Sequence, residues 1–284
     1  MRVFLALCFL GSAVVSNAQI VHPKASPFQE VSQDVGLSEV HIRYSRPAVK
    51  GRKIFGNVVP YGRIWRVGAN ESTKISLTHP MQIGDHQIPA GTYALYAFPE
   101  AAAWEIVFHK DTTLWGDGRD AYSPSDELFR TPVVPEPWPV VQENFLITFD
   151  HITHNSLEML LIWDRTCIRI PMEVDTQSLM EAAIAEALSK EPSAQSYYEA
   201  ARYLQEEGRD YDRALNYIDK SLEYGGDTYY FYRVRSLILE ALGSYPEAIE
   251  AARRSEVLAA KEGKDEFVRM NRDNIEKWTE LIKE

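Results

Sequence analysis

The residue pattern of the chain changes near residue 175, and this change limits the fold more than any other feature of the sequence. Of the 15 prolines, 13 precede that point, and so do all seven histidines. The first part is a series of short β-branched and aromatic runs separated by Gly, Pro and Asn, as in antiparallel β proteins. Apolar residues after residue 175 recur with a helical period. A chain of 284 residues is long enough for two domains, and we place them at 25–174 and 176–284.

Several runs in the first part are predicted to be strands, and no helical pattern separates them. The predicted strands cover residues 40–45, 73–78, 92–98, 104–110, 144–149, 157–163 and 167–174. In one of them, Phe145, Ile147 and Phe149 alternate with Leu146 and Thr148, which predicts two unlike faces. Such a set indicates an antiparallel sandwich or barrel, and we favour the β-sandwich.

An offset of 34 residues recurs in the second part. It links Met180 with Ala214 and Ala248, Ile184 with Ile218 and Ala252, Ala187 with Ser221 and Ser255, Tyr198 with Tyr232, and Tyr211 with Tyr245. This pattern resembles the tetratricopeptide repeat over residues 176–260, followed by a closing helix over 264–283. Arg235 and Ser236 depart from that motif, which usually has a leucine and a glycine there. The resemblance implies helical hairpins whose concave face contacts a protein partner. Because roughly three repeats are needed for a self-standing groove, helices that only pack on the β domain are the favoured interpretation, and partner contact is the alternative.

A basic stretch interrupts a chain whose net charge is −11. Between Arg43 and Lys74 there are eight cations and one acid, Glu71, with glycines and aromatic residues between them. Arginine forks match carboxylates and phosphates in two-point contacts, so the loops are expected to bind an anionic or saccharide ligand. The residues expected to bind it are Arg46, Arg52, Tyr61, Trp65, Arg66 and Asn70. Ion pairs with acids elsewhere are the alternative, and Lys50 and Lys53 are interpreted as solvated charges.

The same stretch carries a family resemblance. Its motifs are Tyr44-Ser45-Arg46-Pro47, Lys50-Gly51-Arg52, Phe55-Gly56, Pro60-Tyr61-Gly62 and Trp65-Arg66-x-Gly68-Ala69-Asn70-Glu71, followed by Ala90-Gly91-Thr92-Tyr93, Trp104-Glu105-Ile106, Trp115-Gly116 and Tyr122. This ordered set resembles a family of secreted bacterial β domains known only as a domain of unknown function. It covers roughly residues 25–174 and implies no activity, cofactor or catalytic residue.

Two functional classes remain open from the sequence. The leading interpretation is a non-catalytic binding or adaptor protein. The alternative is a hydrolase acting on an envelope saccharide or ester, with Glu71 as acid or base and Asp117 or His109 as its partner. An Arg66–Glu71 or Arg52–Glu71 ion pair would instead give Glu71 a structural role.

Other ligand classes are not expected. The acidic net charge argues against general nucleic-acid binding. His151 and His154 are three residues apart, but only Asp150 is near them in sequence, and a metal site usually needs three protein ligands. No nucleotide-binding or hydrolase motif is present, so no metal and no cofactor are predicted.

The N-terminus predicts export. Arg2 precedes an apolar run over residues 3–15, and Asn17 and Ala18 then lead into Gln19, which is typical of a signal peptide cleaved after Ala18. The run is too short to be a membrane span. Cleavage would remove Cys8 and leave Cys167 alone, as a small buried filler. The expected location is periplasmic or secreted.

Overall fold

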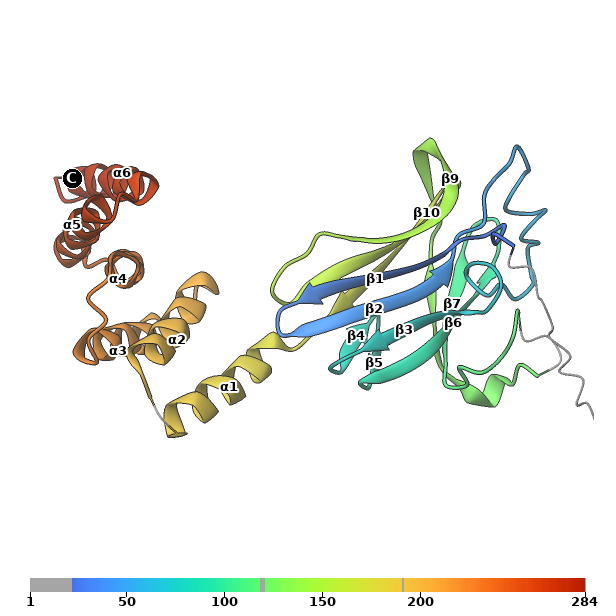
Figure 1. The fold of residues 1–284 in the computed structure, drawn as a ribbon, viewed down its shortest axis with the longest axis horizontal. Helices are drawn as coiled ribbons and strands as arrows, with labels where there is room; N and C mark the ends of the chain where they lie inside the picture. Colours follow the sequence, from blue (N-terminus) through green and yellow to red (C-terminus); the bar gives the residue numbers. More distant parts are fainter. Residues whose placement is uncertain (1–21, 118–120, 191, 284) are drawn as a thin grey trace, which may run out of the picture. The chain divides into compact units, whose positions relative to one another are not determined.

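The β-branched and aromatic runs before residue 175 form two antiparallel sheets, and six helices follow (Figure 1). This computed structural model describes residues 22–117, 121–190 and 192–283. The chain divides into two compact units, a β unit over 1–175 and a helical unit over 176–284. The predicted fold class, an antiparallel β domain before a helical domain, is confirmed. The predicted signal peptide lies outside the described residues.

Within the described residues, the larger sheet has six strands in the order β1-β2-β3-β6-β7-β8. These are β1 (Phe28–Val35), β2 (Ser38–Ser45), β3 (Thr73–Leu77), β6 (Gly91–Pro99), β7 (Trp104–His109) and β8 (Glu127–Val133), with a short 3-10 helix at Pro124–Asp126. The smaller sheet has four strands in the order β5-β4-β10-β9. They are β4 (Met81–Ile83), β5 (His86–Ile88), β9 (Glu136–Asp150) and β10 (Ser156–Glu173).

One predicted break is a bulge inside a long strand. The sequence separates residues 157–163 from 167–174, but the first run and all of the second except residue 174 belong to β10. Asp164 has φ 54°, and the pairing of β10 with β9 shifts register on both sides of it. An extra residue in one strand produces such a local twist without ending the strand. Strands β1, β4, β5 and β8 were not predicted, because β1 is rich in polar residues and β4 and β5 have three residues each.

An aromatic cluster joins the two sheets. Phe55 contacts Trp104 of β7, with ring centroids 4.7 Å apart, and Trp163 of β10, at 6.2 Å. Phe145 of β9 lies 5.2 Å from Trp65. These rings come from both sheets and from the long connection between β2 and β3. Burying such large rings provides much of the hydrophobic stabilisation of a core and fixes the connection on the sheets.

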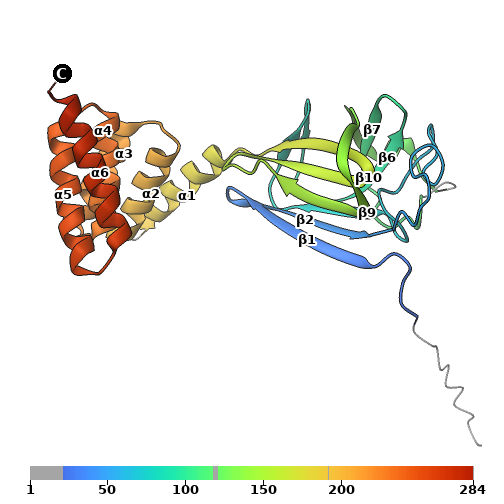
Figure 2. The ribbon, with the colours of Figure 1, turned by 90° about the horizontal axis from the view of Figure 1, so that it is seen from above.

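The helical unit contains α1 to α6 (Figure 2). Their bounds are α1 (Thr176–Lys190), α2 (Ala194–Glu206), α3 (Tyr211–Glu223), α4 (Tyr229–Ala241), α5 (Tyr245–Lys261) and α6 (Asp265–Leu281). Ala214 of α3 and Ala248 of α5, which are 34 residues apart, are both fully buried. Small side chains at these positions let neighbouring helices approach closely, so the repeated residues lie at repeated packing positions.

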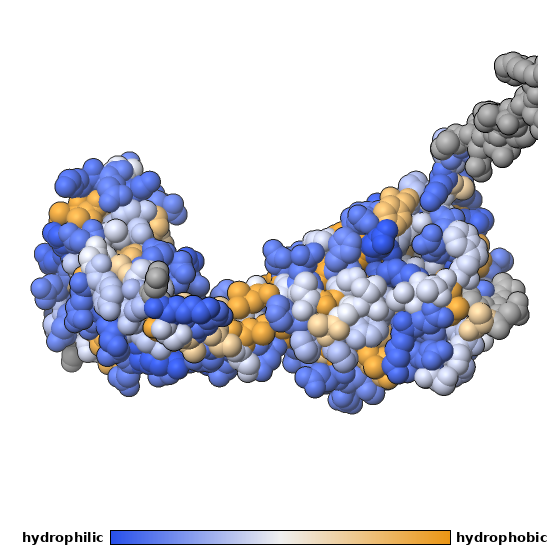
Figure 3. All heavy atoms as spheres, turned by 60° about the horizontal axis from the view of Figure 1, so that its bottom comes forward, coloured by the Kyte–Doolittle hydropathy of each residue, from blue (hydrophilic) through white to orange (hydrophobic). Residues whose placement is uncertain are grey.

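The surface of the described residues carries both polar and apolar side chains. On the face in Figure 3, apolar side chains form small patches among polar ones. None of the helices in the described ranges combines the length and the hydrophobicity that crossing a bilayer requires.

Candidate functional site

The connection from residue 46 to 72 holds most of the basic stretch in a constrained loop. Val67 has φ 52° although it is β-branched and fully buried. The surrounding structure holds this conformation, because Thr73 donates from Oγ1 to the Val67 carbonyl (2.5 Å) and from its amide to the Arg66 carbonyl (3.1 Å). A strained residue that the fold holds in place often marks a functional site. Here the constraint fixes the backbone next to Arg66.

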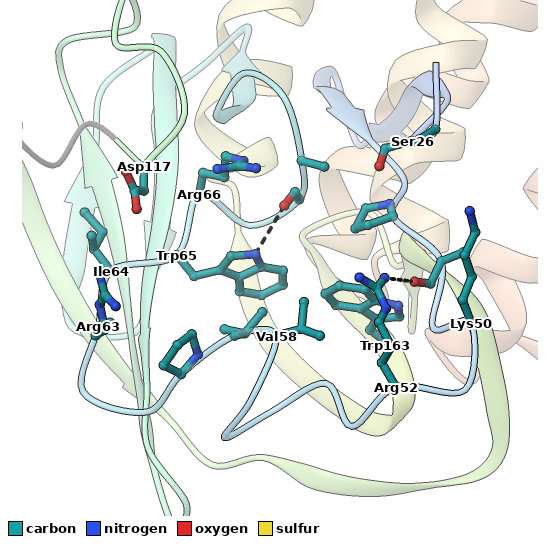
Figure 4. A pocket seen from close by; sticks show the side chains of 17 residues that line it. Ser26, Lys50, Arg52, Val58, Arg63, Ile64, Trp65, Arg66, Asp117 and Trp163 are labelled. Carbon is teal, nitrogen blue, oxygen red and sulfur yellow. Dashed lines mark hydrogen bonds between the residues drawn. The ribbon is translucent and has the colours of Figure 1, made fainter. Parts of the chain in front are cut away.

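A pocket of about 550 Å³ opens on this connection, and we call it the arginine pocket (Figure 4). It is lined by Ala25, Ser26, Pro47, Ala48, Lys50, Arg52, Val58, Val59, Pro60, Arg63, Ile64, Trp65, Arg66, Gly68, Ala69, Asp117 and Trp163. In Figure 4, Arg66 and Asp117 lie on one side, Lys50 and Arg52 lie on the other, and Trp65 lies between them. Four cations and one acid therefore surround one concave volume of the size that small ligands occupy.

Backbone carbonyls hold one of these cations in place. Arg52 donates from Nε to the carbonyl of Val49 (3.0 Å) and from Nη2 to that of Ala48 (2.5 Å). The loop also turns tightly here, since Lys50 has φ 47° and the following Gly51 has φ 66°. Fixed guanidinium groups lose less conformational freedom when they bind an oxyanion than free ones do.

The opposite side of the pocket comes from two loops. Gly116, in the loop after β7, lies beside Arg66: a β-carbon at this glycine would be 3.7 Å from Nη1 of Arg66. Asp117 follows it in the chain and lines the pocket. A β-carbon at this distance would make an ordinary van der Waals contact, so the second loop packs against the guanidinium, and glycine is favoured at 116 by its φ of 64°.

The floor of the pocket is aromatic. Trp65 and Trp163 stack with their planes 18° apart, and both are buried. Trp65 is fixed by its own polar atoms, because Nε1 donates to the Gly68 carbonyl (3.2 Å) and its amide donates to the Ala97 carbonyl of β6 (2.8 Å). Nε1 of Trp163 is also buried, but it has no acceptor among the described residues. A buried donor without a partner is costly, so it favours any ligand oxygen that can reach it.

The structure brings together only some of the residues predicted from the sequence. Arg52, Trp65 and Arg66 line the arginine pocket, whereas Arg46, Tyr61 and Asn70 do not. Arg46 donates from Nε to the Phe145 carbonyl (2.8 Å) and so ties the start of the loop to β9.

Tyr61 and Asn70 shape the loop instead. Tyr61 is 41% exposed, and its ring covers Gly56: a β-carbon at this glycine would be 2.9 Å from the ring. Asn70 has φ 62°, a conformation that asparagine tolerates, and it donates from Nδ2 to the Ser45 hydroxyl (3.0 Å) and to the Ser26 carbonyl (3.2 Å).

Glu71 and Asp117 of the hydrolase alternative line different pockets, although a backbone bridge pairs Glu71 with Trp115, two residues before Asp117. Glu71 lines a second pocket of about 660 Å³, together with Asn70 and Lys74, whereas Asp117 lines the arginine pocket. In the second pocket, Lys74 is half-buried and contacts the Ser72 hydroxyl, and burial lowers the pKa of its amine.

His109, the other partner considered for Glu71, is fully buried. Its Nδ1 accepts from the Asp111 amide (3.1 Å), and its Nε2 lies 3.1 Å from the Ser123 carbonyl. Both ring nitrogens are thus engaged by the backbone. The geometry pairs Glu71 with neither Asp117 nor His109 in one pocket.

Sequence reasoning missed three residues that line the arginine pocket. Lys50 and Arg63 belong to the basic stretch, so their charge was a usable signal, although Lys50 was interpreted as a solvated charge. Trp163 lies in β10, far from the stretch in sequence, and nothing in its local pattern distinguishes it from a core residue. Only the stacking of Trp163 on Trp65 brings it to the pocket.

The comparisons with known proteins give one result. Residues 26–172 match the model of a family described as "Protein of unknown function (DUF2911)". No curated protein and no solved structure matches the chain. Within the described ranges, no group of three or more His, Cys, Asp or Glu residues is placed to hold a metal ion.

Proposed function

The chain belongs to the DUF2911 family of proteins of unknown function, and we propose that it is a non-catalytic binding protein whose arginine pocket holds an anionic ligand. One observation carries the proposal: Lys50, Arg52, Arg63 and Arg66 surround a single pocket that contains one acid, Asp117. Like charges repel when they are brought together, and the chain as a whole is acidic. An anion in this pocket would relieve the repulsion and supply the missing negative charge.

Most of the positive charge in the pocket is available to such a ligand. Among the residues that the structure describes, no ion pair engages Lys50, Arg52 or Arg63. Arg52 uses two of its five N–H groups on backbone carbonyls, which leaves donors for a second acceptor. Charge-assisted hydrogen bonds from a guanidinium to carboxylate or phosphate are roughly twice as strong as neutral ones.

The floor of the pocket narrows the ligand class. The indoles of Trp65 and Trp163 give the floor an apolar surface. A ligand that fits both the cations and this surface has a carboxylate or phosphate attached to an apolar or sugar-like body. Binding is favoured over the hydrolase alternative, because Glu71 lines a different pocket from Asp117.

Two further parts of the proposal come from the rest of the chain. The N-terminal pattern around Ala18 supports export to the periplasm or the medium, and mass spectrometry of the secreted protein would test it by finding Gln19 as the first residue. The recurring packing positions of α3 and α5 support a tetratricopeptide-like array that contacts a protein partner.

Titration calorimetry with the mature chain tests the arginine pocket. The probes are acetate, inorganic phosphate, glucose 6-phosphate and neutral glucose, at an ionic strength of about 0.15 M so that long-range attraction is screened. We expect glucose 6-phosphate to bind more tightly than phosphate and glucose not to bind. Lys50→Gln is expected to weaken glucose 6-phosphate binding by about five- to tenfold, because it removes one charge contact.

Lys53→Gln is the matched control. Lys53 is exposed, like Lys50, and lies three residues further along, but it does not line the pocket. Lys53→Gln changes the net charge by the same amount as Lys50→Gln. Because Lys53 lies outside the pocket, the affinity of this variant for glucose 6-phosphate should stay within about twofold of that of the parent protein. Equal loss in both variants would show a general charge effect, and equal binding of glucose and its phosphate would contradict an anion site.

A further inference from the structure

A small pocket on the helical unit contains a cation that no acid among the described residues neutralises. The pocket, of about 250 Å³, is formed by α2, α4 and the start of α6. Its lining residues are Tyr198, Arg202, Gln205, Glu206, Tyr230, Arg233, Val234, Leu237 and Phe267. These three helices are alternate members of the array.

Arg233 of α4 is the unusual residue of this pocket. It is partly buried, and burial lowers the pKa of its guanidinium. The only hydrogen bond of its guanidinium within the described part of the chain runs from Nη1 to Oδ1 of Asn271 (3.2 Å), and no carboxylate there pairs with it. A partly desolvated cation without an anion is costly. Four of its five donors remain unused.

A buried chain of hydrogen bonds fixes the partner of Arg233. Asn271 is fully buried and donates from Nδ2 to the Ser255 hydroxyl (2.8 Å), which in turn donates to the Tyr229 carbonyl (2.6 Å). Because the amide nitrogen is committed to Ser255, the amide oxygen faces Arg233. The guanidinium is therefore held in place by a neutral acceptor and keeps its full charge.

The other charges of the pocket cancel each other. Arg202 donates from Nε to Glu206 at 2.7 Å, so the acid in the lining is already paired with its own cation. One uncompensated positive charge remains, that of Arg233. Around it, Val234, Leu237 and Phe267 provide apolar contacts. The pocket is smaller than the ~300 Å³ at which small-molecule sites begin, so it fits one or two side chains rather than a whole ligand.

We propose that this pocket docks an acidic segment of a partner protein, in which a carboxylate pairs with Arg233 and an adjacent apolar side chain contacts Leu237 and Phe267. The inference rests on the proposed role of the helical unit in contacting a partner. The carboxylate replaces water around a cation that the fold has already partly desolvated, so the pairing loses less solvation than a surface ion pair. The apolar contacts add affinity without adding charge.

Fluorescence anisotropy with the mature chain tests this at an ionic strength of about 0.15 M. One probe is a labelled decapeptide of alternating leucine and aspartate, and the other alternates leucine and asparagine. The acidic probe should bind at least about tenfold more tightly than the amide probe, a difference typical of a well-formed charge-assisted pair. Arg233→Gln should abolish this preference.

Two further variants separate the proposed contact from damage to the fold. Arg235→Gln lies on the same helix and makes the same change, but Arg235 is paired with Asp219 at 2.7 Å, so the preference should persist. Asn271→Asp places a carboxylate where an amide oxygen now lies 3.2 Å from Arg233, and it should abolish the preference while the helices stay folded.

Three results would overturn the inference. The acidic probe could bind Arg233→Gln as tightly as it binds the parent protein, the two probes could bind equally, or the acidic probe could fail to bind. Equal binding of both probes would still leave a helical unit that contacts peptides, so the broader proposal would survive. Anion binding in the arginine pocket is measured separately and does not depend on Arg233.

Discussion

The indole rings of Trp65 and Trp163 stack with their centroids 6.0 Å apart, although one residue lies in the loop before β3 and the other in β10. This contact places a residue of the smaller sheet in the floor of a pocket whose cations come from loops. The two indoles differ in one respect: Nε1 of Trp65 donates to the Gly68 carbonyl, whereas that of Trp163 has no acceptor among the described residues.

This difference predicts unequal effects of the same substitution. Trp65→Phe breaks a hydrogen bond and leaves the Gly68 carbonyl without that donor, whereas Trp163→Phe removes a donor that has no protein partner. Both variants lose similar apolar area. The free energy of unfolding should therefore fall by about 1 kcal/mol more in Trp65→Phe. Urea unfolding followed by tryptophan fluorescence measures it, because five of the six tryptophans precede residue 175.

Substitution of Arg46 should affect the free energy of unfolding, whereas substitution of Arg52 should affect anion affinity. Arg46→Gln removes the hydrogen bond to the Phe145 carbonyl and should lower the free energy of unfolding by about 1–2 kcal/mol, with anion affinity unchanged. Arg52→Gln should weaken anion binding by about tenfold, since it removes a charged donor from the pocket. Calorimetry and urea unfolding on both variants give the comparison, and equal losses of affinity would place Arg46 in the site after all.

Glu127 should make the β unit sensitive to acid. The hydrogen bond with Arg130 (2.6 Å) and that from Tyr122 (2.6 Å) lower the pKa of its carboxyl below 4.5. A lowered pKa in the folded state contributes stability that is complete above the unfolded value and is lost as the pH falls. The parent protein should lose this contribution as the pH falls through 4.5 and below, and Glu127→Gln should show a flatter profile from a lower plateau.

Urea unfolding at a series of pH values measures that profile. Asp85→Asn, in the turn between β4 and β5, is the control, because no ion pair or hydrogen bond engages the Asp85 side chain in the described residues. Its profile should parallel that of the parent protein. A Glu127→Gln profile as steep as the parent's would show that other carboxyls dominate acid unfolding.

Gly226 should tolerate no side chain. A β-carbon there would lie 2.2 Å from two ring carbons of Phe231 and 2.7 Å from the Ser221 carbonyl oxygen. Gly226→Ala should therefore lower the stability of the helical unit by more than about 2 kcal/mol, because Phe231 is buried and cannot move freely.

Gly263→Ala provides the comparison for Gly226. It also lies in the helical unit, with φ 69° and no atom within 4 Å of its added β-carbon. Only backbone strain of about 1 kcal/mol is expected there. Thermal unfolding followed by circular dichroism measures both variants, and equal losses would show that strain, and not the clash with Phe231, is the dominant effect.

The basic stretch shows how far sequence could predict the site. Charge and arginine content pointed to the connection before β3, and Arg52, Trp65 and Arg66 line one pocket there. The direction of a side chain, however, depends on backbone angles that local pattern does not reveal. Asn70 at φ 62° and Arg46 turned toward β9 were therefore indistinguishable in sequence from their neighbours that face the pocket.

The sequence by itself determined the fold class, because alternation with period two and recurrence with a helical period are properties of local residue order. It also determined where the positive charge is concentrated. Tertiary structure alone decided which cations share a pocket, that Trp163 forms part of its floor, and that Glu71 and Asp117 line different pockets. Those facts depend on contacts between segments far apart in the chain, and no local pattern specifies such contacts.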